Sequence, residues 1–263
     1  MEREPVLALQ AWGGGGHALS GVWLERLGDF VLATLLVGYA WLVVRALLRR
    51  RWYRAAGVLS ADDLAAVHAA LAAAERRTVG EILPVVLERS DRHPGAAWLA
   101  ALTCMLIGTV GLAPWLAWNQ PAFVLATQLA LGALGYASAR LLPDFLRAFV
   151  SEARAQEMVE EQAVQEFHRH QLERTEARTG VLLFVSLLER RALVLADEGI
   201  HARVAPEQWQ RTNELVLAGL RRGSLREGLL AGIASAGEVL AQHFPAVDGD
   251  RNEVPDRVIV RRD

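Results

Sequence analysis

The chain has 263 residues and carries 28 basic and 30 acidic side chains, so its net charge at neutral pH is −2. This near balance creates no overall positive field that would attract nucleic acid. The one cysteine, Cys104, excludes a disulfide bond within the chain. The length allows one soluble domain with its own core beside a few membrane-spanning helices.

The N-terminal part of the sequence predicts a flexible segment followed by a membrane helix. Residues 1–26 lack a basic stretch that leads directly into an apolar run, so we expect no cleaved signal peptide. Residues 27–48 include an uncharged stretch, Phe30 to Val44, that suits a transmembrane helix if the charged residues at its borders reach the interfaces. The alternative is an amphipathic helix that lies on the membrane surface.

Residues 60–95 predict a helix and a strand of a soluble domain. Ser60 and Asp63 have the spacing of a capping box, and apolar residues then recur at helical spacing. The segment Glu81–Glu88 is largely apolar and predicts a strand. Pro84 within it predicts an edge or a bulge, because proline cannot complete the hydrogen bonds of an interior strand.

Residues 96–142 contain two apolar runs, Ala96 to Trp118 and Ala122 to Leu142, joined by the short turn Asn119–Pro121. Each run can cross a bilayer core of roughly 30 Å, which needs about 20 helical residues. We therefore expect a transmembrane helical hairpin whose two outer ends emerge on the same side. Two core helices of a soluble domain are the alternative, which the near absence of charge in both runs disfavours.

The distribution of arginine predicts how these helices cross the membrane. Arginines follow the first and the last predicted span, namely Arg45, Arg49, Arg50, Arg51, Arg54, Arg140 and Arg147. The turn Asn119–Pro121 carries no charge. By the positive-inside rule, the soluble parts should be cytoplasmic, with the N-terminus and the hairpin tip outside. We expect an integral protein of a bacterial inner membrane.

Residues 143–244 predict the second part of the soluble domain. A long polar helix from about Pro143 to Arg178 is expected to continue the last span. Two apolar strands, Val181–Leu188 and Ala192–Ala196, follow it. They are so close in sequence that they must pair as an antiparallel hairpin.

Two helices complete this part. Pro206 suits the first position of one helix, and Ser224 with Glu227 forms a capping box before the other. Residues 245–263 are rich in Pro, Asp and Arg and are expected to be a tail on the surface. Strand, crossover, antiparallel hairpin and flanking helices predict a small α/β domain with the membrane hairpin inserted in its crossover, combined with about three transmembrane helices.

Several segments carry a resemblance to a known family. They are Glu75–Glu81 (ERRTVGE), Thr179–Ser186 (TGVLLFVS), the turn with Arg190 and Arg191, Asp197–Ile200 (DEGI) and Leu225–Gly232 (LREGLLAG). Together they resemble the TPM domain, over roughly residues 60–244 once the hairpin is left out. The resemblance implies a TPM-like α/β fold. Some members of that family have been described as weak phosphatases or metal-binding modules, and others as accessory factors in the assembly or repair of membrane complexes.

The best candidate site follows the second strand of the predicted hairpin. Asp197, Glu198 and His201 stand where a strand passes into a loop, and carboxylates with an imidazole at such a junction can hold a divalent cation such as calcium or magnesium. The alternative is an exposed turn that binds no cofactor. The tripeptide His168–Arg169–His170 is a weaker candidate, because residues two apart on a helix point in different directions. We expect it to be a solvated helix face.

The sequence contains no nucleophile elbow, zinc-binding helix or phosphate-binding glycine loop, so no catalytic residue is predicted. We therefore expect a non-enzymatic accessory or assembly protein whose partners are the lipid bilayer and other membrane proteins. The alternative is a membrane-tethered phosphatase or other hydrolase that uses Asp197, Glu198 and a bound divalent cation.

Overall fold

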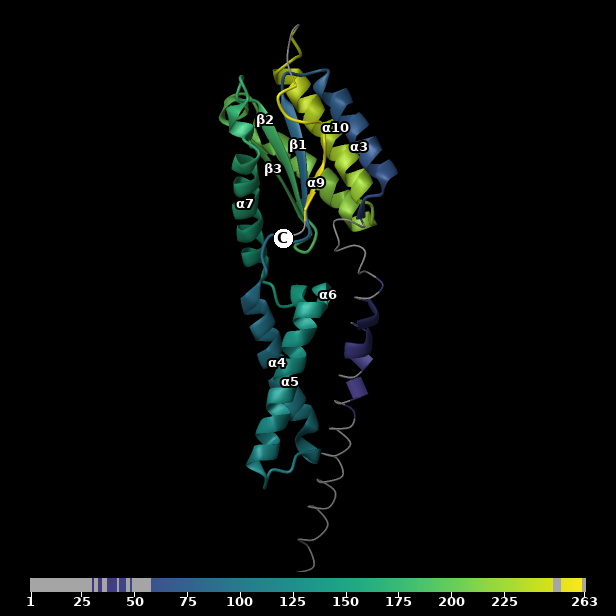
Figure 1. The fold of residues 1–263 in the computed structure, drawn as a ribbon, viewed down its shortest axis with the longest axis vertical. Helices are drawn as coiled ribbons and strands as arrows, with labels where there is room; N and C mark the ends of the chain where they lie inside the picture. The colour runs from purple at the N-terminus through teal and green to yellow at the C-terminus, as the bar shows by residue number, and fades with distance from the viewer. Residues whose placement is uncertain are drawn as a thin grey trace, which may run out of the picture. The chain divides into compact units, whose positions relative to one another are not determined.

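The computed structural model describes residues 30, 33–34, 37–41, 43–45, 48, 58–247 and 252–261 (Figure 1). The chain divides into two compact units. The hairpin unit contains residues 93–149 together with the N-terminal residues up to Leu47, and the α/β unit contains residues 48–92 and 150–263. The predicted flexible segment 1–26 and much of the predicted span 27–48 lie outside the described residues.

The α/β unit is built on a four-stranded sheet with the order β3-β2-β1-β4. The strands are β1 (Glu81–Leu87), β2 (Gly180–Ser186), β3 (Arg191–Ala196) and β4 (Ile259–Arg261). β1 runs parallel to both β2 and β4, and β2 pairs with β3 in antiparallel fashion. The predicted hairpin of two apolar strands is therefore confirmed.

Pro84 predicts an edge strand, but β1 lies between β2 and β4. β1 pairs with β2 along its whole length, whereas β4 pairs with it only from Val85 to Leu87. Pro84 therefore falls in the half of β1 that has a strand on one side only. The missing N–H of proline is tolerated there, since no ladder bond to β4 is required.

Helices cover both faces of this sheet. They are α3 (Ala61–Glu75), α7 (Glu152–Arg169), the short α8 (Glu198–His201), α9 (Pro206–Arg222) and α10 (Leu225–His243). α3, α9 and α10 lie on one face and α7 lies on the other (Figure 1). Leu183 of β2 packs in the core on the side of α3, α9 and α10, and its neighbour Phe184 packs in the core on the side of α7. Burial on both faces explains why β2 has no polar side.

The predicted continuous helix from Pro143 to Arg178 is wrong. α5 ends at Leu141, a five-residue helix α6 (Pro143–Arg147) follows, and α7 starts only at Glu152. Pro143 explains the first break, because proline lacks the N–H that would continue the helical hydrogen bonds. The Ser151 side chain then accepts a hydrogen bond from the backbone N–H of Arg154, which starts α7 anew.

The C-terminal residues are not the surface tail that their composition predicts. Residues 259–261 form β4, and Val254 and Val258 are buried in the cores on the two faces of the sheet. The backbone N–H of Val258 also donates to His68 Nε2 on α3 at 3.3 Å. This segment is therefore an integral part of the α/β unit.

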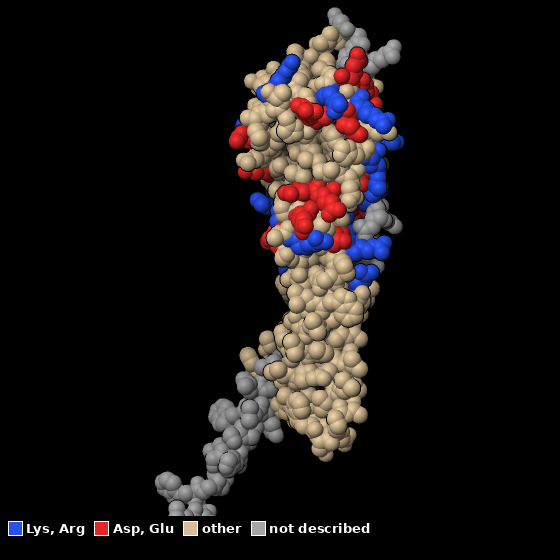
Figure 2. Space-filling model, turned by 90° about the vertical axis from the view of Figure 1, so that its left-hand side faces the viewer, with Lys and Arg blue, Asp and Glu red and all other residues tan. Residues whose placement is uncertain are grey.

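The hairpin unit contains α4 (Pro94–Leu112), the short 3-10 helix η2 (Ala113–Trp115) and α5 (Pro121–Leu141). By length and composition, two helices are able to cross a membrane, Pro94–Trp115 and Pro121–Leu141, with mean hydropathy 1.9 and 1.4. Only 22% and 17% of their most apolar windows are buried within the chain. Figure 2 shows the surface of this helical pair without acidic or basic side chains over most of its length. Both helices lie in the described part of the chain, to which this finding is limited.

Candidate functional site

Asp197, the first predicted cation ligand, is a buried capping residue. It follows β3, its backbone N–H donates to the carbonyl oxygen of Gly180 at 2.9 Å, and its side chain is only 6% exposed. Its Oδ1 accepts a hydrogen bond from the N–H of Glu198 at 2.7 Å and lies 3.9 Å from the guanidinium of Arg178. Oδ2 is buried and makes no hydrogen bond. The carboxylate therefore holds the start of α8.

Glu198 and His201, the other two predicted ligands, lie at the surface. The His201 Nδ1 atom is 3.1 Å from the backbone carbonyl oxygen of Asp197 and thus serves the same turn. In the described ranges, no group of three or more His, Cys, Asp or Glu side chains is arranged to hold a metal ion. These residues do not form a ready cation site, and metal binding here stays a prediction.

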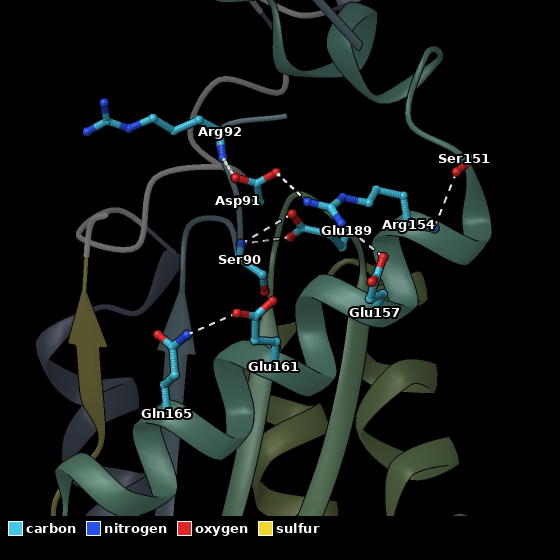
Figure 3. Close-up of polar contacts among 9 residues, drawn as sticks. All are labelled: Ser90, Asp91, Arg92, Ser151, Arg154, Glu157, Glu161, Gln165 and Glu189. Carbon is cyan, nitrogen blue, oxygen red and sulfur yellow. Dashed lines mark hydrogen bonds and ion pairs between the residues drawn. The ribbon is translucent and has the colours of Figure 1, made fainter. Parts of the chain in front are cut away.

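A different polar cluster lies at the carboxyl ends of β1 and β2, where α/β proteins place many of their sites. The Glu189 carboxylate, which is buried, accepts the backbone N–H of Ser90 with both oxygens at 3.2 Å (Figure 3). The hydroxyl of Ser186 also donates to Glu189. One buried carboxylate thus joins the loops that follow two parallel strands.

Arg154 in the first turn of α7 extends this cluster. Its guanidinium lies 2.9 Å from the Glu157 carboxylate and 4.0 Å from the Asp91 carboxylate, while the side chain of Arg92 points away (Figure 3). Asp91 in turn accepts the N–H of Arg92 at 2.7 Å. Ser90, Asp91, Arg154 and Glu189 are called the neck cluster below.

The neck cluster lies where the chain leaves and re-enters the α/β unit. The chain passes into the hairpin unit after Arg92 and returns at Val150. Arg154 holds the returning segment to Asp91 of the departing one. Sequence reasoning missed this cluster because Ser90 and Glu189 are 99 residues apart. The available signal was a polar residue directly after each of two buried strands.

Arg191 of β3 also holds the start of α7. Its guanidinium contacts the Glu152 carboxylate at 2.5 Å and the Gln156 side-chain oxygen at 2.5 Å. These contacts connect the first residue of β3 to the first turns of α7. The helix that follows the hairpin is therefore bound to the sheet at both the neck cluster and β3.

The tripeptide 168–170 is only partly the solvated face that was predicted. His168 is exposed and pairs with Glu173 at 3.6 Å. Arg169 and His170 instead contact the fully buried carboxylate of Glu166, at 2.9 and 3.3 Å. His168 and His170 thus point toward different partners.

Acidic side chains gather at the amino end of β1. Burial raises the pKa of Glu75 to about 9, and the nearby carboxyls of Asp256 and Glu81 add to the effect. The N–H of Ile82, which donates to Glu75 at 3.2 Å, opposes it. Glu75 is therefore protonated at neutral pH, so the group can act as a hydrogen-bond donor toward Asp256.

Part of the α/β unit matches a known protein family. The family model described as the TPM domain matches residues 146–239, from α6 to α10. The solved structures include the NMR structure of BA42 protein from the psychrophilic bacterium Bizionia argentinensis, at 19% identity and a TM-score of 0.49, covering 78% of this chain and 95% of that one. No curated protein matches the chain. The match to the family model shows that this chain contains a TPM domain.

Proposed function

We propose that the chain is an integral membrane protein that presents its TPM domain at the cytoplasmic face and serves other membrane proteins as an accessory or assembly factor. The observation that carries the proposal is the outward-facing apolar surface of α4 and α5. Large side chains such as Leu106, Val110 and Leu129 are mostly exposed there. Exposed apolar side chains along two whole helices mark a surface that lipid or another protein covers.

The dimensions of the hairpin support a bilayer as its environment. α4 has 19 residues and α5 has 21, so each is about 28 to 32 Å long at 1.5 Å per residue. The rings of Trp98 and Tyr136 pack 5.0 Å apart near the open end, and exposed Trp115 and Trp118 stand near the tip. Aromatic side chains at both ends match the two headgroup regions.

The charges of the hairpin unit support a cytoplasmic open end. Arg140 is exposed in the last turn of α5, and Arg147 follows in α6. The tip between Ala113 and Gln120 carries no charge. The positive-inside rule then assigns the open end, and with it the TPM domain, to the cytoplasm.

The contacts within the TPM domain support a non-catalytic role. Glu189 and Arg154, two of its most prominent charged groups, are engaged by backbone and side-chain partners that hold the loops around the hairpin. The polar cluster at the strand ends therefore holds together the two segments of the domain that lead to and from the hairpin. The unbonded Oδ2 of Asp197 favours the alternative, a cation-dependent phosphatase.

Two experiments test this proposal. Reporter fusions at Asn119 and at the C-terminus should report an outside tip and a cytoplasmic C-terminus, and extraction with alkaline carbonate should leave the protein in the membrane. A C-terminal reporter that is active only outside would overturn the orientation. A soluble protein after extraction would overturn membrane insertion itself.

The accessory role is tested in cells that lack the protein. We expect the amount of at least one membrane complex to fall, and both the parent chain and the Asp197→Asn, Glu198→Gln variant should restore it. Rescue by the parent alone, together with divalent-cation binding and phosphate-ester hydrolysis that the variant loses, would instead establish the hydrolase. An unchanged membrane proteome would contradict the accessory role.

A further inference from the structure

Within the hairpin unit, two residues that precede the α/β unit make polar contacts with α5 and α6. The hydroxyl of Tyr39 lies 3.1 Å from the hydroxyl of Ser138 on α5. The Nε atom of Arg45 lies 4.0 Å from the Asp144 carboxylate on α6. Both contacts join residues about a hundred positions apart in the sequence, so they define a tertiary arrangement and not a local turn.

Each contact gives a buried polar group a polar partner. Ser138 is buried between helices, where its hydroxyl also donates to the carbonyl oxygen of Leu134 at 2.6 Å. The Asp144 side chain is 7% exposed. The guanidinium of Arg45 also lies 5.1 Å from the ring centre of Trp41, so it has both an ionic and an aromatic partner. Such pairs hold membrane helices together, because hydrocarbon offers a lone polar group no alternative partner.

The two contacts also define a direction. Tyr39 and Arg45 are six residues apart, and so are their partners Ser138 and Asp144. The lower-numbered residues pair with each other and so do the higher-numbered ones, so the two segments run parallel. An antiparallel arrangement would bring Tyr39 toward Asp144 and Arg45 toward Ser138. Since α5 runs from the hairpin tip toward the open end, the segment of Tyr39 does so too.

We propose that the described helical residues around Tyr39 and Arg45 belong to a third membrane span, which packs parallel to α5 and enters the bilayer on the side of the hairpin tip. The inference rests on the membrane insertion proposed above and adds the number of spans, their packing and the direction of the third span. The Tyr39–Ser138 pair lies within the bilayer, and the Arg45–Asp144 pair lies at the cytoplasmic boundary.

The sequence that follows agrees with this direction. Arg49, Arg50, Arg51 and Arg54 come directly after the segment, on the side that the parallel packing assigns to the cytoplasm. The contacts and the arginine distribution are independent observations, because one depends on partners in α5 and α6 and the other on composition alone. A helix lying flat on the membrane surface would satisfy the second observation but not the Tyr39–Ser138 contact.

Cross-linking in native membranes tests the direction. In a Cys104→Ala background, the parallel pairs Tyr39→Cys with Ser138→Cys and Arg45→Cys with Asp144→Cys should be joined by a short, membrane-permeable bifunctional thiol reagent. The crossed pairs Tyr39→Cys with Asp144→Cys and Arg45→Cys with Ser138→Cys should be joined several times less. The opposite ranking would overturn the parallel packing. Equal, low yields for all four pairs would overturn the packing altogether.

Two controls separate this inference from membrane insertion. Val37 is exposed and two residues from Tyr39, so Val37→Cys with Ser138→Cys has a similar depth but faces away, and it should give little product. Arg45→Asp should weaken the cross-link between positions 39 and 138, and adding Asp144→Arg should restore it. Carbonate extraction of each variant reports insertion of the hairpin separately, so loss of cross-linking in an inserted protein contradicts the third helix alone.

Discussion

The Glu166 carboxylate on α7 lies 3.1 Å from the guanidinium of Arg261 on β4. Glu166 is fully buried, and Arg169 and His170 of its own helix also contact it. A buried carboxylate is tolerated when charged partners compensate for its lost hydration. The pair therefore joins the last strand, which has only three residues, to the helix that covers that face of the sheet.

Glu166→Ala should destabilise the α/β unit by about 1–3 kcal/mol, because it removes hydrogen bonds to charged groups in a buried setting. Arg169 and Arg261 are partly exposed and can be rehydrated, which limits the loss. Urea-dependent hydrogen exchange of the full chain in detergent would measure it, with the largest local effect at residues 259–261. The control Glu157→Ala removes an exposed acid of the same helix and should change stability by less than about 0.5 kcal/mol. Equal effects of the two variants would refute the anchoring of β4 by Glu166.

The stability of the α/β unit should decrease as the pH rises because of Glu75. Its pKa is raised from 4.5 to about 9, so between these values the folded chain holds a proton that the unfolded chain has lost. The contribution of this proton is complete below pH 4.5 and is lost by about pH 9. Urea unfolding at a series of pH values should show a decrease toward pH 9 that Glu75→Gln reduces. Gln keeps an acceptor for the N–H of Ile82. A variant that is unfolded at every pH would therefore mean that Glu75 stabilises the domain by its packing and not by its proton.

Features that depend on neighbours in sequence were predictable. The capping box of Ser60 and Asp63 is present in both directions, and the N–H of Ser60 lowers the pKa of the Asp63 carboxyl below its usual value. β2 was predictable because its uninterrupted apolar run allows no solvated face, and its pairing with β3 was predictable because the two strands are close in sequence. In each case the partners are close in sequence, three positions apart in the capping box and between five and 15 positions apart in the hairpin.

Features that depend on distant partners were not predictable. β4 was missed because Ile259–Arg261 is too short to show strand periodicity and is specified by its pairing with β1. The position of Asp197 after a strand predicts a ligand, but whether its side chain faces solvent or the start of α8 depends on the fold around it. The same holds for the neck cluster, whose members are far apart in sequence and come together only in the folded chain.

Glu189 should be more important for stability than its place in a charged turn suggests. Glu189→Ala removes the acceptor of the Ser90 N–H and a partner of the Ser186 hydroxyl, so we expect a loss of about 1–3 kcal/mol. Glu189→Gln should not restore stability fully, because its NH2 group would face the N–H of Ser90, a second donor. Limited proteolysis should show faster cleavage in the loop around Arg92 for both variants. Cleavage and unfolding that match the parent chain would rule out a structural role for this carboxylate.

The packing of α4 against α5 depends on a glycine that has no space for a side chain. A Cβ atom at Gly135 would lie 2.7 Å from Cβ of Cys104 and 2.8 Å from the carbonyl oxygen of Ala100, whereas one at Gly132 would have no neighbour closer than 3.8 Å. Gly135→Ala should therefore separate the two helices and raise the rate at which Cys104 reacts with a maleimide in detergent. Gly132→Ala adds the same methyl group one turn earlier and should leave the rate unchanged. If both variants label like the parent chain, the helices do not pack closely at Cys104, and the small residues of this pair reflect composition and not contact.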